Sequence, residues 1–329
     1  MSIPSLPELQ ELFEMFLTDH PIPDTSENLY DPIRYIMSMG GKRVRPLLCL
    51  LTCAVARGKV YKAFHAAMTV EYFHNFTLMH DDIMDNADLR RGKPTVHKRY
   101  NINSAILSGD ALLVMAYDSL SRTPNTCRDK LTALFNRTAE QVCRGQQMDI
   151  DFEATNLVSI EQYIEMITLK TAVLIACSIQ MGAIISGISE QDCISLYRFG
   201  ENLGIAFQLQ DDFLDIYGTE TSFGKKKGGD ILNNKKTHLL LHALEHAQPQ
   251  DREILLQWLA QNTDNDADAT AKIEAITAIF DRTGAPEALQ HTMQEYYNKA
   301  LQNLSDVQLP DIRKNVLAEL AESLMNRNV

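Results

Sequence analysis

Segments with the periodicity of an α-helix cover most of this 329-residue sequence. Segment 64–88 contains neither glycine nor proline. Segments 104–121, 131–150, 160–187 and 190–217 likewise have apolar residues that recur at spacings of three and four. This recurrence places apolar side chains on one face of a helix, whereas a strand would alternate them. Because almost no stretch alternates apolar with polar residues, we expect an all-α fold.

Composition supports one large helical domain. The chain has only 15 glycines and 11 prolines, which disfavours disorder and an all-β sandwich with its many turns. Hydrophobic residues make up 45% of the sequence, enough to fill a sizeable core. The breaks between helical segments are short, so we expect a single domain over residues 1–329. The region after about residue 245 is expected to form peripheral amphipathic helices.

The charge balance limits the class of ligand. The 31 basic and 43 acidic residues give a net charge of −12, which argues against nucleic-acid or anionic-membrane binding. The basic residues nevertheless gather in a few places: Lys42, Arg43 and Arg45; Arg90, Arg91 and Lys93; Lys225, Lys226 and Lys227; Lys235 and Lys236. An acidic protein with local basic clusters is expected to bind small anions.

The cysteines and the N-terminal segment indicate a cytoplasmic protein. The six cysteines form no CxxC pair, and scattered thiols are typical of a reducing compartment. We expect no secretory signal, because the N-terminal residues lack a basic region followed by an apolar one. Residues 171–189 carry no charge, but Gln180, Ser178, Ser186 and two glycines interrupt them. We therefore expect a buried core helix there and no membrane span.

Two aspartate clusters carry the strongest chemical signal. Each has aspartates at positions i, i+1 and i+4 inside apolar helical sequence: Asp81, Asp82 and Asp85; Asp211, Asp212 and Asp215. On a helix the first and last members of each cluster share one face, where their like charges repel. A cation would relieve that repulsion. Carboxylates suit Mg²⁺, which commonly binds one or two of them together with substrate phosphates, so we expect two Mg²⁺ sites that clamp a diphosphate from both sides.

Five motifs in this order resemble the trans-isoprenyl diphosphate synthases: GGKRVRP (40–46), DDIMDNADLRRGKPTVH (81–97), KT (170–171), QLQDDFLD (208–215) and GKKKGGDILNNKKT (224–237). The resemblance spans about residues 30–240. It implies an all-α bundle around a central apolar cavity, assembled as a homodimer. It also implies Mg²⁺-dependent, head-to-tail condensation of isopentenyl diphosphate with dimethylallyl, geranyl or farnesyl diphosphate.

The resemblance also assigns roles by motif position. For Mg²⁺ it implies Asp81, Asp85 and Asp211 as ligands, with Asp82, Asp212 and Asp215 in support. For isopentenyl diphosphate it implies Lys42, Arg45, His74 and Arg91. For the allylic diphosphate it implies Arg90, Lys170, Thr171, Gln208, Lys225 and Lys235. Among these, Lys170, Lys225 and Arg90 would stabilise the charge that grows on the leaving diphosphate.

Two aromatic residues precede the first aspartate cluster and bear on product length. Phe76 and Phe73 lie five and eight residues before Asp81, or about 7.5 Å and 12 Å along a helix. In the family an aromatic residue at the first position is typical of short-chain enzymes. We therefore expect a product of fifteen to twenty carbons, farnesyl or geranylgeranyl diphosphate. The sequence leaves open which of the two is made, which allylic starter is preferred and which pathway the product enters.

Other functions remain as alternatives. A class I terpene cyclase or a head-to-head synthase would share the fold, but neither needs the motif at 40–46, and a cyclase would typically lack the second DDxxD at 211–215. A non-catalytic prenyl synthase subunit would usually have lost some of these motifs. Glu71 and His74 could belong to a carboxylate di-iron bundle, but we find no second Glu-x-x-His in a comparable helix.

Overall fold

The computed structural model describes residues 3–155, 158–218, 228–261 and 265–326. Its chain divides into two compact units. The first unit comprises Met1–Thr138, Leu174–Tyr197 and Ser305–Leu317, and the second comprises Ala139–Val173, Arg198–Leu304 and Ala318–Val329. That both belong to one domain over residues 1–329 stays a prediction.

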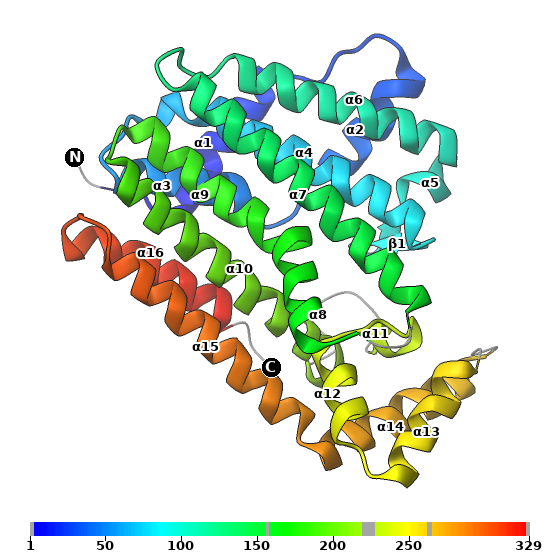
Figure 1. Ribbon diagram of the computed structural model, residues 1–329. Coiled ribbons are helices and arrows are strands. Elements are labelled where there is room, and N and C mark those ends of the chain that lie inside the picture. The colour runs from blue at the N-terminus through cyan, green and yellow to red at the C-terminus, as the bar shows by residue number, and fades with distance from the viewer. Residues whose placement is uncertain (1–2, 156–157, 219–227, 262–264, 327–329) are drawn as a thin grey trace. The chain divides into compact units, whose positions relative to one another are not determined.

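Helices account for nearly all regular structure in the described residues, which confirms the all-α prediction (Figure 1). The first unit contains α1 (Leu6–Asp19), α2 (Glu27–Ser38), α3 (Val44–Val55), η1 (Val60–Lys62), α4 (Phe64–Met84), β1 (Leu89–Arg90), β2 (Lys93–Pro94), α5 (Val96–Arg99), α6 (Ile102–Ser121) and most of α9 (Val173–Ser186). The second contains α8 (Ile160–Ile167), η2 (Thr168–Ala172), α11 (Gly229–Leu232), α12 (His238–His246), α13 (Pro249–Ala260), α14 (Asp266–Thr283) and nearly all of α15 (Ala285–Ser305). Both units draw on α7 (Arg128–Ala154), α10 (Glu190–Tyr217) and α16 (Asp311–Met325).

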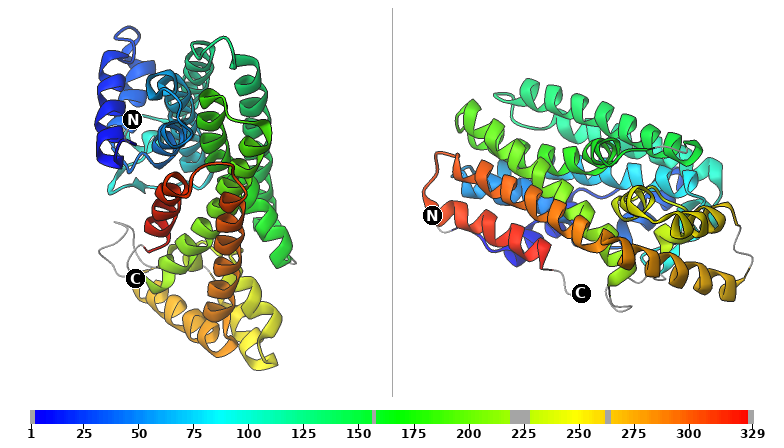
Figure 2. Two further views of the ribbon diagram at one scale, coloured as in Figure 1. Left: turned by 90° about the vertical axis from the view of Figure 1, so that its left-hand side faces the viewer. Right: turned by 60° about the horizontal axis from the view of Figure 1, so that its bottom comes forward.

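Helix α4 is central to the first unit. It packs against α3 and α6, and α1 packs against α3 and α4 in turn (Figures 1 and 2). Its buried residues include Ala66, Val70 and Phe73, which follow a helical spacing toward the core. The helix ends at Met84, earlier than the expected boundary at residue 88, because Asn86 takes a left-handed conformation with φ of 47°.

A short hairpin follows α4, where no strand was expected from the sequence. Strands β1 and β2 pair antiparallel, with Leu89 opposite Pro94 and Arg90 opposite Lys93. The two loop residues, Arg91 and Gly92, have positive φ angles of 52° and 73°. Positive φ at both positions is typical of the tight turn that suits the twist of a hairpin. Turn geometry rather than alternation of side chains therefore makes these strands.

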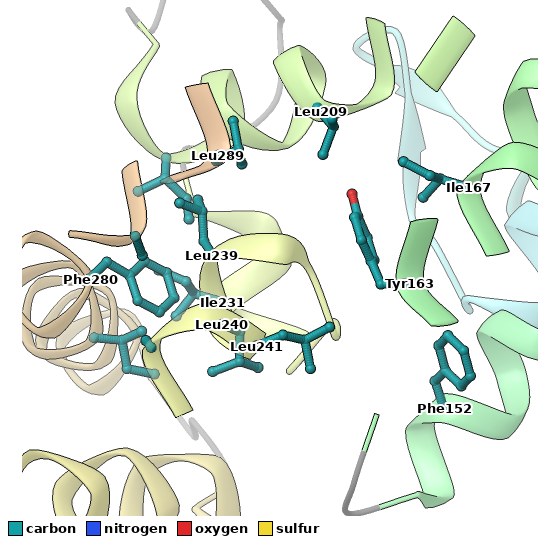
Figure 3. Packing of buried hydrophobic residues seen from close by; sticks show 14 of the residues in the cluster. Phe152, Tyr163, Ile167, Leu209, Ile231, Leu239, Leu240, Leu241, Phe280 and Leu289 are labelled. Atoms are coloured by element: carbon teal, nitrogen blue, oxygen red, sulfur yellow. The ribbon is translucent and has the colours of Figure 1, made fainter. Parts of the chain in front are cut away.

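The second unit has its own hydrophobic core. Residues of α8, α10, α12 and α14 meet there, including Ile167, Leu209, Leu239 and Phe280 (Figure 3). Tyr163 of α8 is also part of this cluster, with only 1% of its surface exposed. Its ring contributes apolar area, while its hydroxyl requires a hydrogen-bond partner inside the core.

One continuous helical stretch, Ile160–Ser186, is long and apolar enough to cross a membrane. Its most apolar 18-residue window has a mean hydropathy of 1.6, but 78% of that window is buried inside the protein. Val173, Ile175 and Ile179 are among the buried side chains. The core helix of a globular protein has the same character, as we expected for residues 171–189.

Candidate active site

The loop before α3 is fixed by a buried arginine. Arg43 adopts a left-handed conformation with φ of 46°, and only 8% of it is exposed. Its Nη1 donates to Glu71 Oε1 at 2.5 Å, and its Nη2 donates to the carbonyl oxygen of Met37 at 2.9 Å. Asn75 Nδ2 donates to the same Glu71 oxygen at 3.0 Å. Because Glu71 is held in this ion pair, it is not disposed as a di-iron ligand beside His74.

Three of the four residues expected to bind isopentenyl diphosphate lie together in the first unit. Arg45 Nη1 lies 3.3 Å from His74 Nε2, and Arg91 Nη1 donates to the carbonyl oxygen of Gly40. Gly41 lies against the Arg91 guanidinium, and its φ of 134° is a backbone conformation that side chains rarely adopt, so the loop favours glycine there. Lys42, the fourth residue, is exposed on the same loop.

His74 reports the electrostatic character of this cluster. Burial holds the pKa of His74 well below its ordinary value, and Arg45, Arg91, Arg90 and Arg43 lower it further. The ring is therefore neutral at neutral pH. Since arginine can only donate, Nε2 accepts the bond from Arg45. Several guanidiniums around one neutral imidazole form a site suited to a multiply charged anion such as a diphosphate.

The first aspartate cluster lies at the C-terminal end of α4, beside the hairpin (Figure 1). Asp82 is 2% exposed, and its two carboxylate oxygens accept from Arg90 Nε at 2.9 and 2.8 Å. Burial raises the pKa of Asp82 even against the lowering effect of Arg90. Asp81 is partly exposed and Asp85 is exposed, so these two have carboxylates that solvent can reach.

The second cluster on α10 repeats this arrangement. Asp212 is 5% exposed, accepts a short hydrogen bond from the hydroxyl of Tyr163, and accepts another from Gln208 Nε2 at 2.9 Å. Figure 3 shows the Tyr163 hydroxyl pointing toward the helix that carries Leu209. Burial and the charge of Asp230 raise the pKa of Asp212 well above its ordinary value. In both clusters the middle aspartate is thus buried and hydrogen-bonded within the fold.

Asp215, the last member of the second cluster, orders the segment that follows the undescribed residues 219–227. Its Oδ2 accepts from the backbone N–H of Asp230 at 3.0 Å, and its carbonyl oxygen accepts from the N–H of Gly228 at 2.8 Å. These bonds bring the Asp230 backbone to the cluster. Lys225, expected to contact the allylic diphosphate, lies outside the described residues.

Four other residues expected at the allylic diphosphate lie in the second unit. Lys170 Nζ donates to Asp149 Oδ2 at 2.7 Å, and Lys235 Nζ donates to the same oxygen at 3.3 Å. Thr171 Oγ1 donates to Gln208 Oε1 at 3.2 Å. Burial would raise the pKa of Asp149, but the two lysines hold it below its ordinary value. The sixth expected residue, Arg90, lies in the first unit, bonded to Asp82.

Sequence reasoning missed Asp149, Tyr163 and Asp230. Asp149 lies 21 residues before Lys170, so only the packing of α7 against the α8–η2 stretch brings the two together. Tyr163 gave a weak signal, since a tyrosine inside an apolar helix usually finds a partner for its hydroxyl. Asp230 follows Gly228 and Gly229 in the sequence, and its hydrogen bond to Asp215 can be recognised only in the folded chain.

The two aromatic residues proposed to limit product length lie on α4, in the first unit. Phe73 is 1% exposed and lies 5.2 Å, ring centre to ring centre, from Phe135 of α7 in an edge-to-face arrangement. Phe76 is half-buried, with its ring 5.5 Å from Phe73 and 4.8 Å from the ring of His80. Both are therefore part of an aromatic cluster one to two turns below Asp81.

The aspartate clusters fit a hard divalent cation by their donor chemistry. Among residues 3–155, 158–218, 228–261 and 265–326, no three His, Cys, Asp or Glu side chains form a ready metal site. Mg²⁺ commonly takes one or two carboxylates and completes its shell with water and substrate phosphates. An aspartate pair on one helix, Asp81 with Asp85 or Asp211 with Asp215, supplies such a set. That the two clusters face each other stays a prediction.

Comparison with known proteins gives one family. The family model described as polyprenyl synthetase matches residues 26–276. A geranylgeranyl pyrophosphate synthase of Geoglobus acetivorans is 37% identical, covering 92% of each chain. A crystal structure of a geranylgeranyl pyrophosphate synthase has a TM-score of 0.95 at 41% identity and covers 99% of this chain and 100% of that one.

A further solved relative carries ligands. The geranylgeranyl pyrophosphate synthase of Corynebacterium glutamicum was crystallised with isoprenyl diphosphate and magnesium. Its TM-score is 0.88 at 29% identity, and the match covers 100% of both chains.

Proposed function

Since the chain belongs to the polyprenyl synthetase family, we propose that it condenses isopentenyl diphosphate head to tail with allylic diphosphates, with geranylgeranyl diphosphate as its main product. The chain is a short-chain trans-prenyltransferase of isoprenoid biosynthesis. The named relatives are synthases of this kind, which favours none of the cyclase, head-to-head or non-catalytic alternatives.

The observation that carries the proposed reaction is the cationic cluster around His74. A carbon–carbon bond with isopentenyl diphosphate forms only if its diphosphate is held while its alkene stays free. Arg45 beside His74 and Arg91 beside Gly40 each carry a guanidinium, a group that can bind phosphate oxygens bidentately, and Lys42 lies on the same loop as Gly40. The Arg43–Glu71 ion pair keeps the loop in place without competing for substrate.

We assign the allylic diphosphate to Lys170, Thr171, Gln208 and Lys235, with Arg90 and Lys225. Asp149 holds Lys170 and Lys235 on one oxygen, so their ammonium groups are already gathered before substrate arrives. A diphosphate would take over part of these contacts. Preorganised cations act most strongly where negative charge grows, here on the leaving oxygen.

Asp81, Asp85, Asp211 and Asp215 would hold Mg²⁺, with Asp82 and Asp212 supporting them from buried positions. When bound, Mg²⁺ neutralises diphosphate charge and so lowers the barrier to loss of the leaving group.

The chemistry itself needs no protein nucleophile. The allylic carbon–oxygen bond breaks, giving diphosphate and an allylic cation. The alkene of isopentenyl diphosphate attacks this cation, forming the new carbon–carbon bond, and a proton then leaves to the departed diphosphate. Apolar side chains along the prenyl chain must exclude water, which would otherwise quench the cation.

We further propose that the chain works as a homodimer in the cytoplasm. Helix α6 carries exposed apolar side chains: Ile102, Ile106, Leu107, Val114 and Tyr117, each between 39% and 67% exposed. Exposed apolar groups gathered on one helix are typical of an interaction surface. All six cysteines lie in the described part of the chain and are free, as suits a reducing compartment. Light scattering on the eluting protein tests the dimer, and a monomeric mass would contradict it.

A direct assay tests the proposed reaction. Purified protein is incubated with Mg²⁺, isopentenyl diphosphate and, separately, dimethylallyl, geranyl or farnesyl diphosphate. We expect consumption of isopentenyl diphosphate with every starter and a C20 product. Release of diphosphate from the allylic substrate alone would indicate a cyclase, and binding without turnover would indicate a non-catalytic subunit.

A further inference from the structure

The helical stretch that carries Lys170 widens for one turn. Residues Thr168–Ala172 form a π-helical turn, closed by a hydrogen bond from the N–H of Val173 to the carbonyl oxygen of Thr168. Such turns are rare and occur frequently at functional sites. The extra residue rotates the side chains relative to an uninterrupted α-helix. Lys170 and Thr171 both lie inside this turn.

Two glycines on neighbouring helices border the π turn. A Cβ at Gly145 of α7 would lie 2.3 Å from the backbone nitrogen of Lys170, and one at Gly204 of α10 would lie 2.7 Å from the Cα of Ala172. Real Cβ atoms essentially never approach other atoms within 3.0 Å. Because the opposing atoms are mostly backbone, they cannot swing aside as the end of a flexible side chain would.

Lys170 and Thr171 of the π turn each donate a hydrogen bond to a residue on a neighbouring helix. One of the two glycines lies one helical turn before each of these acceptors. Gly145 precedes Asp149 by four residues on α7, and Asp149 accepts from Lys170 at 2.7 Å. Gly204 precedes Gln208 by four residues on α10, and Gln208 accepts from Thr171 at 3.2 Å. Residues four apart lie on the same face of a helix. Close contact at the glycine therefore brings the π turn within reach of the polar partner one turn later.

We propose that Gly145 and Gly204 are positioning residues, which hold the π turn between α7 and α10 and thereby aim Lys170 and Thr171 at the allylic diphosphate. This rests on the proposed function, because it takes the roles of Lys170 and Thr171 from there. It adds that the backbone of two other helices, with no side chain between, determines where those groups lie.

Alanine at each glycine tests the proposal against a matched control. Gly182 of α9 packs as tightly on backbone, since a Cβ there would lie 2.1 Å from the carbonyl oxygen of Cys49, but it belongs to the first unit and its close contacts are with α3. Far-UV circular dichroism and thermal melting give the folded fraction of Gly145→Ala, Gly204→Ala and Gly182→Ala. Steady-state kinetics then give kcat and the KM of each substrate per folded molecule.

We expect Gly145→Ala and Gly204→Ala to lower kcat/KM for the allylic diphosphate by about 100-fold, the cost of a misplacement of about 1 Å. The KM for isopentenyl diphosphate should change less than about threefold, because the residues assigned to it belong to the first unit and include neither glycine nor any residue of the π turn. Gly182→Ala should melt earlier yet keep its kinetics. An equal kinetic loss in Gly182→Ala, equal damage to both substrates, or wild-type kinetics in both test variants would overturn the proposal.

A second variant covers the case in which both alanine variants fail to fold. Deletion of Thr168 removes one residue from the π turn and leaves both glycines in place. We expect a folded protein with the same selective loss for the allylic diphosphate, and wild-type kinetics would overturn the proposal. Wild-type protein and Lys170→Ala run beside it. No turnover by wild type would refute the proposed function itself, whereas an unimpaired Lys170→Ala would refute only the positioning of that lysine.

Discussion

Asp149 of α7 accepts a hydrogen bond of 2.7 Å from the ammonium group of Lys170, and both groups are partly buried. Lys235 approaches the same carboxylate oxygen at 3.3 Å. One acidic side chain thus neutralises and orients two cations expected to meet a diphosphate. Its removal leaves two lysines close together without a counter-charge, which affects both stability and substrate binding.

Asp149→Asn should therefore lower the free energy of unfolding by about 2–4 kcal/mol at pH 7. The pKa of Asp149 is below its ordinary value, so its stabilisation is complete above the unfolded value of about 3.9 and is lost as the pH falls through the folded value. Urea unfolding of both proteins between pH 6 and pH 3 measures the difference. We expect the difference to shrink toward pH 3, and a constant difference would contradict the ion pair.

His74→Gln should change how the free energy of unfolding depends on pH between pH 7.5 and pH 5.5. The pKa of His74 is held well below 6.5, so below that pH the unfolded chain binds a proton that the folded chain does not. Wild-type stability should then fall by up to about 1.4 kcal/mol per pH unit from this group alone. Unfolding free energies at pH 7.5, 6.5 and 5.5 should fall less steeply in the variant. Parallel curves would mean that His74 titrates normally.

Tyr163→Phe tests the support of the second aspartate cluster. Loss of the hydroxyl leaves the buried Asp212 with one hydrogen-bond donor fewer, so its helix should hold Asp211 and Asp215 less firmly. We expect about a tenfold loss of kcat/KM and a higher Mg²⁺ concentration for half-maximal rate. Tyr217→Phe is the control, because that hydroxyl donates to Asp281 on α14 and should leave the Mg²⁺ dependence unchanged. An identical Mg²⁺ dependence in Tyr163→Phe and wild type would remove this role.

Phe76→Ala should lengthen the product. Phe76 is the half-buried phenylalanine nearest Asp81 on α4, and Phe73 lies one turn deeper, fully buried against Phe135. Mass spectrometry of the prenyl alcohols should show products longer than C20 from Phe76→Ala, whereas Phe73→Ala alone should keep the wild-type length. An unchanged distribution in Phe76→Ala would mean that another side chain limits the growing chain.

Asp81→Ala and Asp211→Ala test the metal assignment. Each should lower kcat by about 10³-fold or more, because charge stabilisation on the leaving diphosphate is lost. Stability should change by less than about 1 kcal/mol, since each substitution removes repulsion between carboxylates on one helix face, and in Asp81→Ala this gain is offset by loss of the 3.9 Å ion pair with Arg90. Circular dichroism and urea unfolding check the fold. Near-wild-type rates in either variant would contradict the assignment.

The helices could be predicted because their signal is local. Segment 190–217 matches α10 at both ends, and 104–121 differs from α6 only at its start. The burial of the middle aspartates, Asp82 and Asp212, was not predicted from the sequence, because helical spacing does not say which face of the helix meets the core. The hairpin was missed because the backbone of Arg91 and Gly92 makes it, without alternating side chains.

The rest depends on contacts between distant residues. No periodicity marks the π turn, which forms where Gly145 and Gly204 let backbones approach. The approach of Lys170 and Lys235 to Asp149 likewise joins three separate elements. The motifs drew attention to Lys170 and Lys235, but only the folded chain identifies Asp149 as the residue that binds both.

Product analysis with isopentenyl diphosphate and farnesyl diphosphate tests the central claim most directly. Purified protein, Mg²⁺ and both substrates should give all-trans geranylgeranyl diphosphate with one isopentenyl unit consumed per product. The same mixture without Mg²⁺ should give none. Unconsumed isopentenyl diphosphate in the complete mixture would contradict the account.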